Sequence, residues 1–153
     1  MTMTTIAPYE VRHGGFTIST ERARLDLDAV FRYLNEESYW AAGIARGVFE
    51  RAVAGSLPFG LYAADGAQIG YARVISDYAT FAWLSDVYVL APYRGKGLGR
   101  FLVTSVMAHP GLHGLRRWML STRDAHRLYA EYGFAAVDPE ALMTRLDPDA
   151  HKR

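Results

Sequence analysis

The chain contains no cysteine among its 153 residues. Disulfide bonds, thiolate metal sites and a cysteine nucleophile are therefore excluded. An excess of either charge is also missing, because 17 Lys and Arg residues stand against 16 Asp and Glu residues, for a net charge of +1. This balance argues against a nucleic-acid binder that depends on a broad basic face, but it is compatible with a local basic pocket for a small phosphorylated ligand.

Long hydrophobic runs are absent as well, and residues 1–8 lack the basic and apolar regions of a secretory signal. We therefore expect a cytoplasmic protein that binds neither a membrane nor a nucleic acid. Half of the residues are hydrophobic and 22% are charged, which is typical of globular proteins. No repeat, linker or low-complexity tract divides the chain, so we expect a single domain over residues 1–153 with an ordered core at about residues 15–147.

The hydrophobic pattern predicts an α/β (α+β) fold. Strand-like alternation occurs at residues 16–19, 59–63, 68–76, 80–89, 117–120, 134–137 and 141–146. Apolar residues at helical spacing predict helices near residues 27–34, 44–53, 98–107 and 125–132. Ser121, with Asp124 three residues later, has the pattern of a capping box at the start of the last helix. The order of these elements indicates a mixed, mostly antiparallel sheet of about seven strands flanked by about four helices.

The segment of residues 86–100 is the most informative part of the sequence. An apolar strand runs into a turn with glycines at positions 95, 97 and 99, and the turn runs directly into an amphipathic helix. Glycines let the backbone approach a ligand closely, and the start of a helix offers unpaired N–H groups and a positive dipole end. Positive side chains flank the same turn at Arg94, Lys96 and Arg100. The segment therefore predicts a binding site for a polyphosphate.

Two common nucleotide-binding motifs do not fit the spacing of this turn. A Walker A loop needs four residues between its first glycine and Gly-Lys-Ser/Thr, whereas Gly99 is followed by Arg100 and Phe101. A Rossmann fingerprint needs Gly-x-Gly-x-x-Gly, which the alternating glycines do not provide. Taken alone, the turn is also compatible with an ordinary solvated loop.

Arg94, Gly97 and Gly99 match the Arg/Gln-x-x-Gly-x-Gly/Ala signature of GNAT acetyltransferases. Downstream, Tyr129 stands four residues before Gly133-Phe134, which resembles a second hallmark of that family. The two motifs occur in the family's order, and the resemblance covers nearly the whole chain. It implies the GNAT fold and N-acetyl transfer from acetyl-CoA, without a metal, to a primary amine of a small molecule or peptide. The resemblance also leads us to expect a homodimer, because members of the family are commonly dimeric.

The resemblance also implies which residues bind acetyl-CoA. The pantetheine arm pairs with the strand backbone before the loop, the pyrophosphate binds the loop amides, and an N–H near Val89 stabilises the oxyanion. Thr122 stands where many relatives have an asparagine that contacts the arm. The expected cofactor contacts are Val87, Tyr88, Val89, Arg94, Gly95, Lys96, Gly97, Leu98, Gly99, Arg100, Thr122 and Tyr129.

Tyr129 matches the family tyrosine that protonates the leaving thiolate, and a tyrosine pKa of about 10 lies near that of a thiol. The general base is less evident, because Phe81, Trp83 and Ser85 occupy the matching strand positions and none of them is a base. Asp86 is the only carboxylate on that strand, but simple alternation places it on the opposite face unless a bulge intervenes. Asp86 as a base or amine anchor, and a water chain without a side-chain base, both stay open.

In this fold the acceptor pocket is formed by the loop between the first two helices and by the last strands. That loop carries Tyr39 and Trp40, which suit an amphipathic or cationic acceptor and equally suit a hydrophobic lid over the core. Arg73 and Asp77 are candidate polar contacts. The alternative to an enzyme is an acetyl-CoA-binding sensor or regulatory module without turnover. The presence of Tyr129 favours the enzyme, and the lack of an evident base keeps the alternative open.

Overall fold

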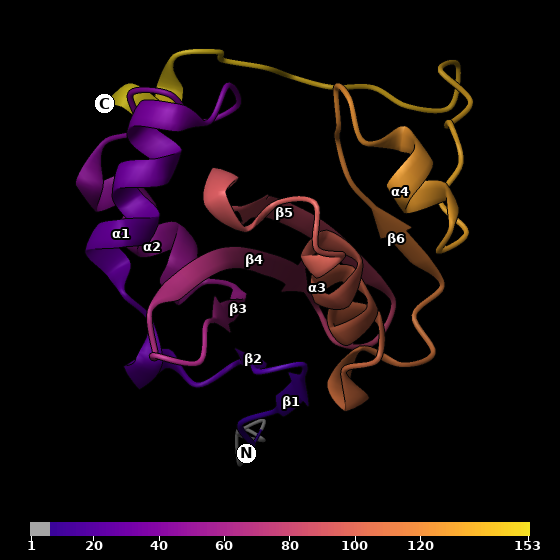
Figure 1. The fold of residues 1–153 in the computed structure, drawn as a ribbon. Coiled ribbons are helices and arrows are strands. Elements are labelled where there is room, and N and C mark those ends of the chain that lie inside the picture. The colour runs from indigo at the N-terminus through magenta and orange to yellow at the C-terminus, as the bar shows by residue number, and fades with distance from the viewer. Residues whose placement is uncertain (1–6) are drawn as a thin grey trace, which may run out of the picture.

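The computed structural model describes residues 7–153, which form one six-stranded sheet (Figure 1). The strands lie side by side in chain order, and neighbours are antiparallel except for the parallel pair β5 and β6. They are β1 (Glu10–His13), β2 (Phe16–Ser19), β3 (Leu57–Tyr62), β4 (Gln68–Ser76), β5 (Phe81–Val89) and β6 (Arg117–Met119). The predicted mixed sheet is confirmed, with six strands in the described part of the chain where the sequence suggested about seven.

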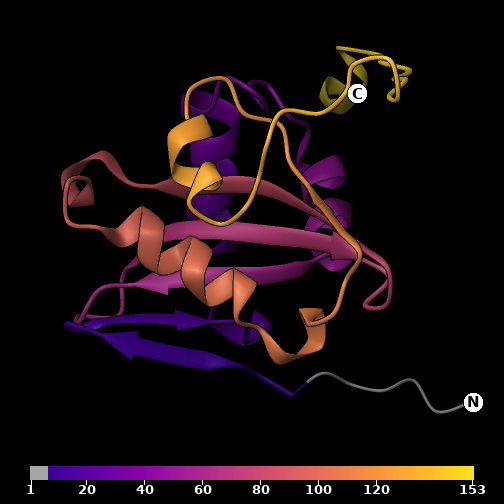
Figure 2. The ribbon, with the colours of Figure 1, turned by 90° about the vertical axis from the view of Figure 1, so that its right-hand side faces the viewer.

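Helices cover both faces of this sheet. They are α1 (Leu27–Arg32), α2 (Arg46–Ala54), α3 (Leu98–Met107) and α4 (His126–Ala130), and a π-helical turn, Tyr33–Glu37, continues α1. Figure 2 shows α3 in front of the sheet and α1 and α2 behind it. The four predicted helices are confirmed. Within residues 7–153, none of them has the length and hydropathy needed to cross a membrane.

The core consists of two apolar layers, one on each face of the sheet. On β4, Tyr71 packs into the layer beneath α1 and α2, whereas Ala72 and Val74 pack into the layer beneath α3. Neighbouring residues of a strand contribute to different layers because successive side chains point to opposite faces of the sheet. The sheet is thus buried from both sides, which is why its central strands read as nearly continuous apolar runs.

The N-terminal strand β1 was not predicted. It pairs with β2 through the tight turn at Gly14 and Gly15, whose φ angles of 56° and 82° are easily adopted only by glycine. The sequence of β1, Glu-Val-Arg-His, has little apolar alternation, because the strand lies at the edge of the sheet and its side chains are mostly exposed. Its stability therefore depends on backbone pairing rather than on a buried face.

The two predicted C-terminal strands are wrong. Residues 134–137 and 141–146 pair with no strand of the described chain and form an irregular segment. The segment leaves α4 and crosses the molecule to the loop between α1 and α2 (Figure 1), where the Ala45 N–H donates to the His151 carbonyl at 2.8 Å. Alternation shows only that a segment is compatible with a strand, because a strand also needs an edge to pair with.

The predicted capping box at α4 is also wrong. The helix begins at His126, and no side chain among residues 7–153 caps its first turn. The Thr122 hydroxyl instead accepts a hydrogen bond from the Ala125 N–H at 3.0 Å and so shapes the turn before the helix. Ser121 and Asp124 therefore lie before the helix, where they cannot form the reciprocal pair of a capping box.

Candidate active site

The strand β5 ends in the glycine-rich loop that begins α3. After the short turn Ala91–Tyr93, Gly95 and Gly97 adopt left-handed φ angles of 80° and 77°, and Gly97 is the N-cap of α3. The backbone amides of residues 95–100 donate to no acceptor within residues 7–153. A Cβ atom placed on Gly95 or Gly97 would meet no atom within 4 Å, so the space in front of these amides is open. The loop thus presents a row of free donors at the positive end of a helix.

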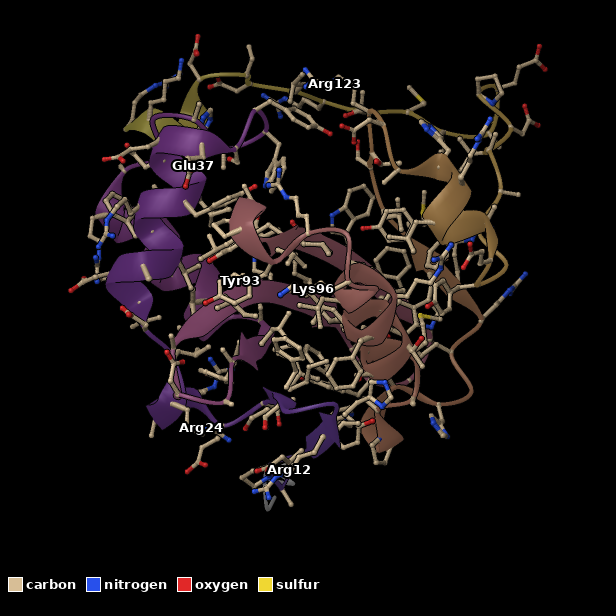
Figure 3. The ribbon with its side chains drawn as sticks, in the orientation of Figure 1. Arg12, Arg24, Glu37, Tyr93, Lys96 and Arg123 are labelled. Atoms are coloured by element: carbon tan, nitrogen blue, oxygen red, sulfur yellow. The ribbon has the colours of Figure 1, made fainter. Side chains whose placement is uncertain are left out.

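The three cations of this loop are in different situations. The Arg94 guanidinium folds back and donates to the Val89 carbonyl at 2.8 Å and to the Tyr33 hydroxyl at 3.1 Å. The Lys96 ammonium lies 5.7 Å from the centre of the Tyr93 ring and has no carboxylate partner in the described chain. Figure 3 labels both residues. Arg94 and Lys96 therefore keep positive charge available for an anion.

Arg100 is engaged elsewhere. Its Nε and Nη2 atoms donate to the two carboxylate oxygens of Glu131 at 2.9 and 2.8 Å. These hydrogen bonds raise the pKa of Arg100 and lower that of Glu131, so both groups stay charged and paired. The backbone amide of Arg100 faces the loop, but in this structure its side chain contributes its charge to an ion pair with α4 and not to the loop.

An unpaired backbone edge leads into this loop. The parallel pairing of β5 with β6 is confined to Phe81–Trp83 on the β5 side. Beyond Trp83 the two strands separate, and the edge of residues 84–89 that faces away from β4 pairs with no strand of the described chain. The Leu90 N–H donates to Ile69 on β4 at 2.8 Å, so alternation directs the Val89 N–H toward the free edge.

Strand β5 contains a bulge at Asp86. Tyr71 opposes Tyr88 and Arg73 opposes Ser85, so β5 has one extra residue between these pairs, and Asp86 has a φ angle of 55°. Simple alternation is therefore wrong here. Leu84 and Val87 both pack against the layer beneath α3, whereas Asp86 and Tyr88 point to the face that carries α1 and α2.

The bulge brings together three residues that the sequence analysis had selected separately. The Asp86 Oδ2 atom accepts from the Arg73 Nε at 2.5 Å, and the Oδ1 atom accepts from the Trp40 indole N–H at 2.8 Å. The side chains of Arg73 and Asp86 are only 16% and 9% exposed. Arg73 also donates to the Ser56 hydroxyl at 3.0 Å. Each carboxylate oxygen of Asp86 thus accepts one hydrogen bond at the point where β5 bends, and each has a further lone pair.

Tyr39 connects this cluster to the other side of the gap between β5 and β6. Its hydroxyl accepts from the Arg123 N–H at 3.0 Å, and the Arg123 guanidinium lies 3.8 Å from the centre of its ring. The Tyr39 and Trp40 rings meet edge to face at 5.1 Å. Because Trp40 binds Asp86 on β5 and Tyr39 binds the segment after β6, the two aromatic residues bridge the separated strands. Figure 3 labels Arg123 near the loop that follows α1.

Tyr129 is buried on α4, and its ring packs edge to face on Phe134 at 5.9 Å. Burial raises its pKa to about 12, with smaller contributions from Tyr39 and Asp124. Its hydroxyl makes no hydrogen bond to any residue that the structure describes. A tyrosine of this kind carries its proton at neutral pH and has that proton free to donate.

Two predicted contacts lie apart from this cluster. The Asp77 carboxylate is used within the β4–β5 turn, where it accepts from the Thr80 hydroxyl and from the amides of residues 79–81. These bonds, led by that of Thr80, hold the pKa of Asp77 well below its usual range, and its role is to shape the turn. The Thr122 hydroxyl accepts the Ala125 N–H, although its own proton stays available for a cofactor.

Sequence analysis missed Tyr33 and Ser56. The Tyr33 ring stacks on Tyr88 with a centroid distance of 3.7 Å, and its hydroxyl receives the Arg94 hydrogen bond. Ser56 supports Arg73 from the end of α2. No local pattern marks either residue, because their partners lie more than a dozen positions away along the chain. Among residues 7–153, no three His, Asp or Glu side chains gather as metal ligands would.

The sequence is similar to known proteins over most of its length. Residues 21–134 match the family model described as the acetyltransferase (GNAT) family. A Gibberella zeae protein, named only as a candidate acetyltransferase, is 31% identical over 143 residues that cover 81% of each chain.

Two solved structures extend these matches. One is a candidate acetyltransferase of the GNAT family from Xanthomonas campestris, with 46% identity, a TM-score of 0.86 and coverage of 90% of this chain and 97% of that one. The other is a GNAT family acetyltransferase from Elizabethkingia anophelis with acetyl-CoA bound. It has a TM-score of 0.63 and 15% identity over 82% of this chain and 80% of its own, so it supports the fold alone.

Proposed function

This chain belongs to the GNAT family of acetyltransferases, and we propose that it transfers the acetyl group of acetyl-CoA to a primary amine of a small molecule or peptide. The amine attacks directly, with both substrates bound. The observation that carries this proposal is the continuity between the free edge of β5 and the free amides of residues 95–100. Backbone groups of this kind need hydrogen-bond partners. In an extended arm that ends in a pyrophosphate, the arm provides partners for the edge of β5 and the pyrophosphate provides acceptors for the loop amides. The same fold holds acetyl-CoA in the Elizabethkingia anophelis structure, and we extend that cosubstrate to this chain as part of the proposal.

The loop suits the phosphates in shape and in charge. The open space beside Gly95 and Gly97 lets phosphate oxygens reach the amides, and Arg94 and Lys96 supply positive charge. The free edge at Val87–Val89 suits the amide groups of the pantetheine arm. Acetyl-CoA supplies the activated thioester. The residues of this chain bind acetyl-CoA, position the amine and take part in proton transfer.

The Val89 N–H and Tyr129 serve opposite ends of the reaction. The amide at the free edge is a donor for the negative charge that develops on the carbonyl oxygen. Tyr129 is protonated at neutral pH, since its pKa of about 12 lies far above 7, and it donates that proton to the departing sulfur. Since the hydroxyl has no other partner in the described chain, this transfer breaks no existing hydrogen bond.

Asp86 serves as an anchor for the amine rather than as the general base. Both of its oxygens already accept hydrogen bonds, one from Arg73 and one from Trp40. Taking a proton would neutralise the carboxylate and remove the attraction that holds the Arg73 guanidinium beside it. The proton of the attacking amine therefore leaves through water. The exposed rings of Tyr39 and Trp40 form the neighbouring wall, which suits a cationic or amphipathic acceptor.

The cofactor site is tested by Gly97→Val with Gly66→Val as its matched control. Both glycines have positive φ angles, 77° and 88°, and both have open space around them, so the backbone strain is similar. Gly66 lies in the β3–β4 turn, away from the loop. By calorimetry, Gly97→Val should weaken acetyl-CoA binding by about tenfold or more, the effect of losing one charge-assisted hydrogen bond. Equal affinity in both folded variants would remove the cofactor site from this loop.

Turnover is tested separately from binding. Acetyl-CoA should stabilise the protein against heat, and a panel of amines should be screened first for further stabilisation and then for release of free thiol. Thiol release that depends on one class of amine would support the enzyme. Tight binding of acetyl-CoA without thiol release for any amine on the panel would favour the sensor or regulatory module.

A further inference from the structure

Tyr33 lies where the end of α1 meets the loop of residues 94–99. It is the first residue of the π-helical turn that continues α1, and only 9% of its surface is exposed. Its ring stacks on that of Tyr88 in β5, with a centroid distance of 3.7 Å and an angle of 13° between the ring planes. Because Tyr88 is buried as well, this stack fixes the Tyr33 ring and therefore the place of its hydroxyl.

The hydroxyl of Tyr33 is bonded to the side chain of Arg94. The Arg94 Nη2 donates to it at 3.1 Å, and the Arg94 Nε donates to the Val89 carbonyl at 2.8 Å. A guanidinium has five N–H groups, so three of them have no acceptor among residues 7–153. Arg94 also has no carboxylate partner in this part of the chain. Its charge and three donors are therefore available to an anion.

Two hydrogen bonds from different nitrogen atoms restrict the orientation of this guanidinium. A single bond from Nε would leave the group free to turn about that bond, and the second bond, to a hydroxyl on another element, fixes its plane. Arg94 is followed directly by residues 95–100, whose amides donate to no acceptor in the described chain. The cation is thus held beside the free amides before any ligand binds, which lowers the entropy that binding would otherwise cost.

We propose that Tyr33 is a positioning residue for acetyl-CoA, and that it holds the Arg94 guanidinium in the orientation that binds the pyrophosphate. This inference rests on the proposed function and adds to it a residue from outside the loop, 61 positions away in the sequence. Burial raises the pKa of Tyr33, so its hydroxyl is neutral at neutral pH. A neutral acceptor orients the guanidinium without cancelling its charge, as a carboxylate in the same place would do.

Tyr33→Phe, with Tyr62→Phe as the matched control, gives the first test. The substitution at Tyr33 removes the hydroxyl and keeps a ring to stack on Tyr88. Tyr62 is also a buried tyrosine beside an arginine, with the Arg24 guanidinium 4.5 Å from its ring centre, but it lies on β3, two strands away from β5. By calorimetry, Tyr33→Phe should weaken coenzyme A binding by about three- to tenfold, the net effect of one hydrogen bond. Tyr62→Phe should bind as the wild type does, and equal affinity in a folded Tyr33→Phe variant would overturn the proposal.

A double-mutant cycle shows whether Tyr33 acts through Arg94. Arg94→Met removes the guanidinium and should weaken coenzyme A binding by itself, and adding Tyr33→Phe should then cause no further loss. If Tyr33→Phe caused the same loss in both backgrounds, Tyr33 would not act through Arg94, and this inference would be wrong while the proposed function stood. A wild-type protein that binds no coenzyme A would remove the proposed function and this inference with it.

The choice of acyl donor gives a measurement that a purely structural role would not change. S-Acetylpantetheine has the thioester and the arm of acetyl-CoA but lacks the pyrophosphate. With an amine identified from the panel, Tyr33→Phe should lower kcat/KM for acetyl-CoA by about three- to tenfold, through KM and not kcat. The same variant should leave kcat/KM for S-acetylpantetheine unchanged. Equal losses with the two donors would show that the hydroxyl supports the fold of the site and not the pyrophosphate contact.

Discussion

Tyr129→Phe separates the roles of this residue in catalysis and in folding. The substitution removes one hydroxyl and leaves the packing against Phe134 in place. If the hydroxyl protonates the departing sulfur, turnover should fall by about 10²-fold or more, which is the usual effect of losing a general acid. That factor corresponds to about 2.7 kcal/mol of transition-state stabilisation. The loss should be in kcat and not in KM for the acceptor, since the hydroxyl acts as charge develops on sulfur.

The structure also predicts how the variant folds. Because the Tyr129 hydroxyl has no hydrogen-bond partner in the described chain, its removal should change the free energy of unfolding at neutral pH by less than about 1 kcal/mol. Tyr132→Phe is the matched control. The Tyr132 hydroxyl bonds to Thr104 at 2.7 Å and donates to the Arg100 carbonyl at 3.0 Å. This control should lose about 0.5–1.5 kcal/mol of stability and keep its kcat.

The pKa of Tyr129 gives a further check that needs no acceptor. Burial raises this pKa from 10.0 to about 12, so the folded protein holds the phenolic proton more tightly than the unfolded chain does. The contribution of this difference to the free energy of unfolding is fully present below about pH 10. Up to about 3 kcal/mol of it is lost as the pH rises through the pKa of the folded state. Denaturant titrations should show that Tyr129→Phe loses less stability at alkaline pH than the wild type does.

Unchanged kcat in a folded Tyr129→Phe variant would refute the assignment of Tyr129 as the general acid and leave water as the proton donor.

Two further predictions concern the ion pairs around the site. Arg73→Met should lower the free energy of unfolding by about 2–4 kcal/mol, because it leaves the Asp86 carboxylate nearly buried and unpaired, and adding Asp86→Asn should recover part of this loss in chemical denaturation. If the double variant were less stable than Arg73→Met, the carboxylate would have another partner. Glu131→Gln should release Arg100 and strengthen acetyl-CoA binding by about two- to fivefold at low salt, with less effect at high salt. Glu50→Gln, which removes the same charge from α2, should not change the affinity in the same calorimetric titration.

The glycine-rich loop between β5 and α3 could be predicted because the residues that specify its shape lie next to one another in the sequence. A strand, alternating glycines and the start of a helix occupy one continuous stretch, and the positive φ angles of Gly95 and Gly97 agree with that prediction. Arg100 is the exception within the loop. Its ion pair with Glu131 joins residues 31 positions apart, and nothing near Arg100 in the sequence indicates it.

The cluster around Asp86 could be predicted only as a set of separate candidates. Arg73, Trp40 and Asp86 were each selected for their chemistry, but their contact depends on the bulge in β5. A bulge is one extra residue in the pairing of two strands, so it is a property of the pair and not of either sequence. Asp77 was likewise selected for its chemistry as a substrate contact, but its carboxylate accepts hydrogen bonds within its own turn, from the Thr80 N–H and hydroxyl.

The sequence by itself determined the order of the main elements, the glycine-rich loop, the family signature and the position of Tyr129, because each depends on spacing within a short stretch of chain. The tertiary structure decided which face carries Asp86, which cations of the loop lack a carboxylate partner, and that residues 134–146 pair with no strand of the described chain. These outcomes depend on which distant segments meet. Hydrophobic periodicity specifies how much of each segment is buried, but pairing and register are decided by the competition among all available edges.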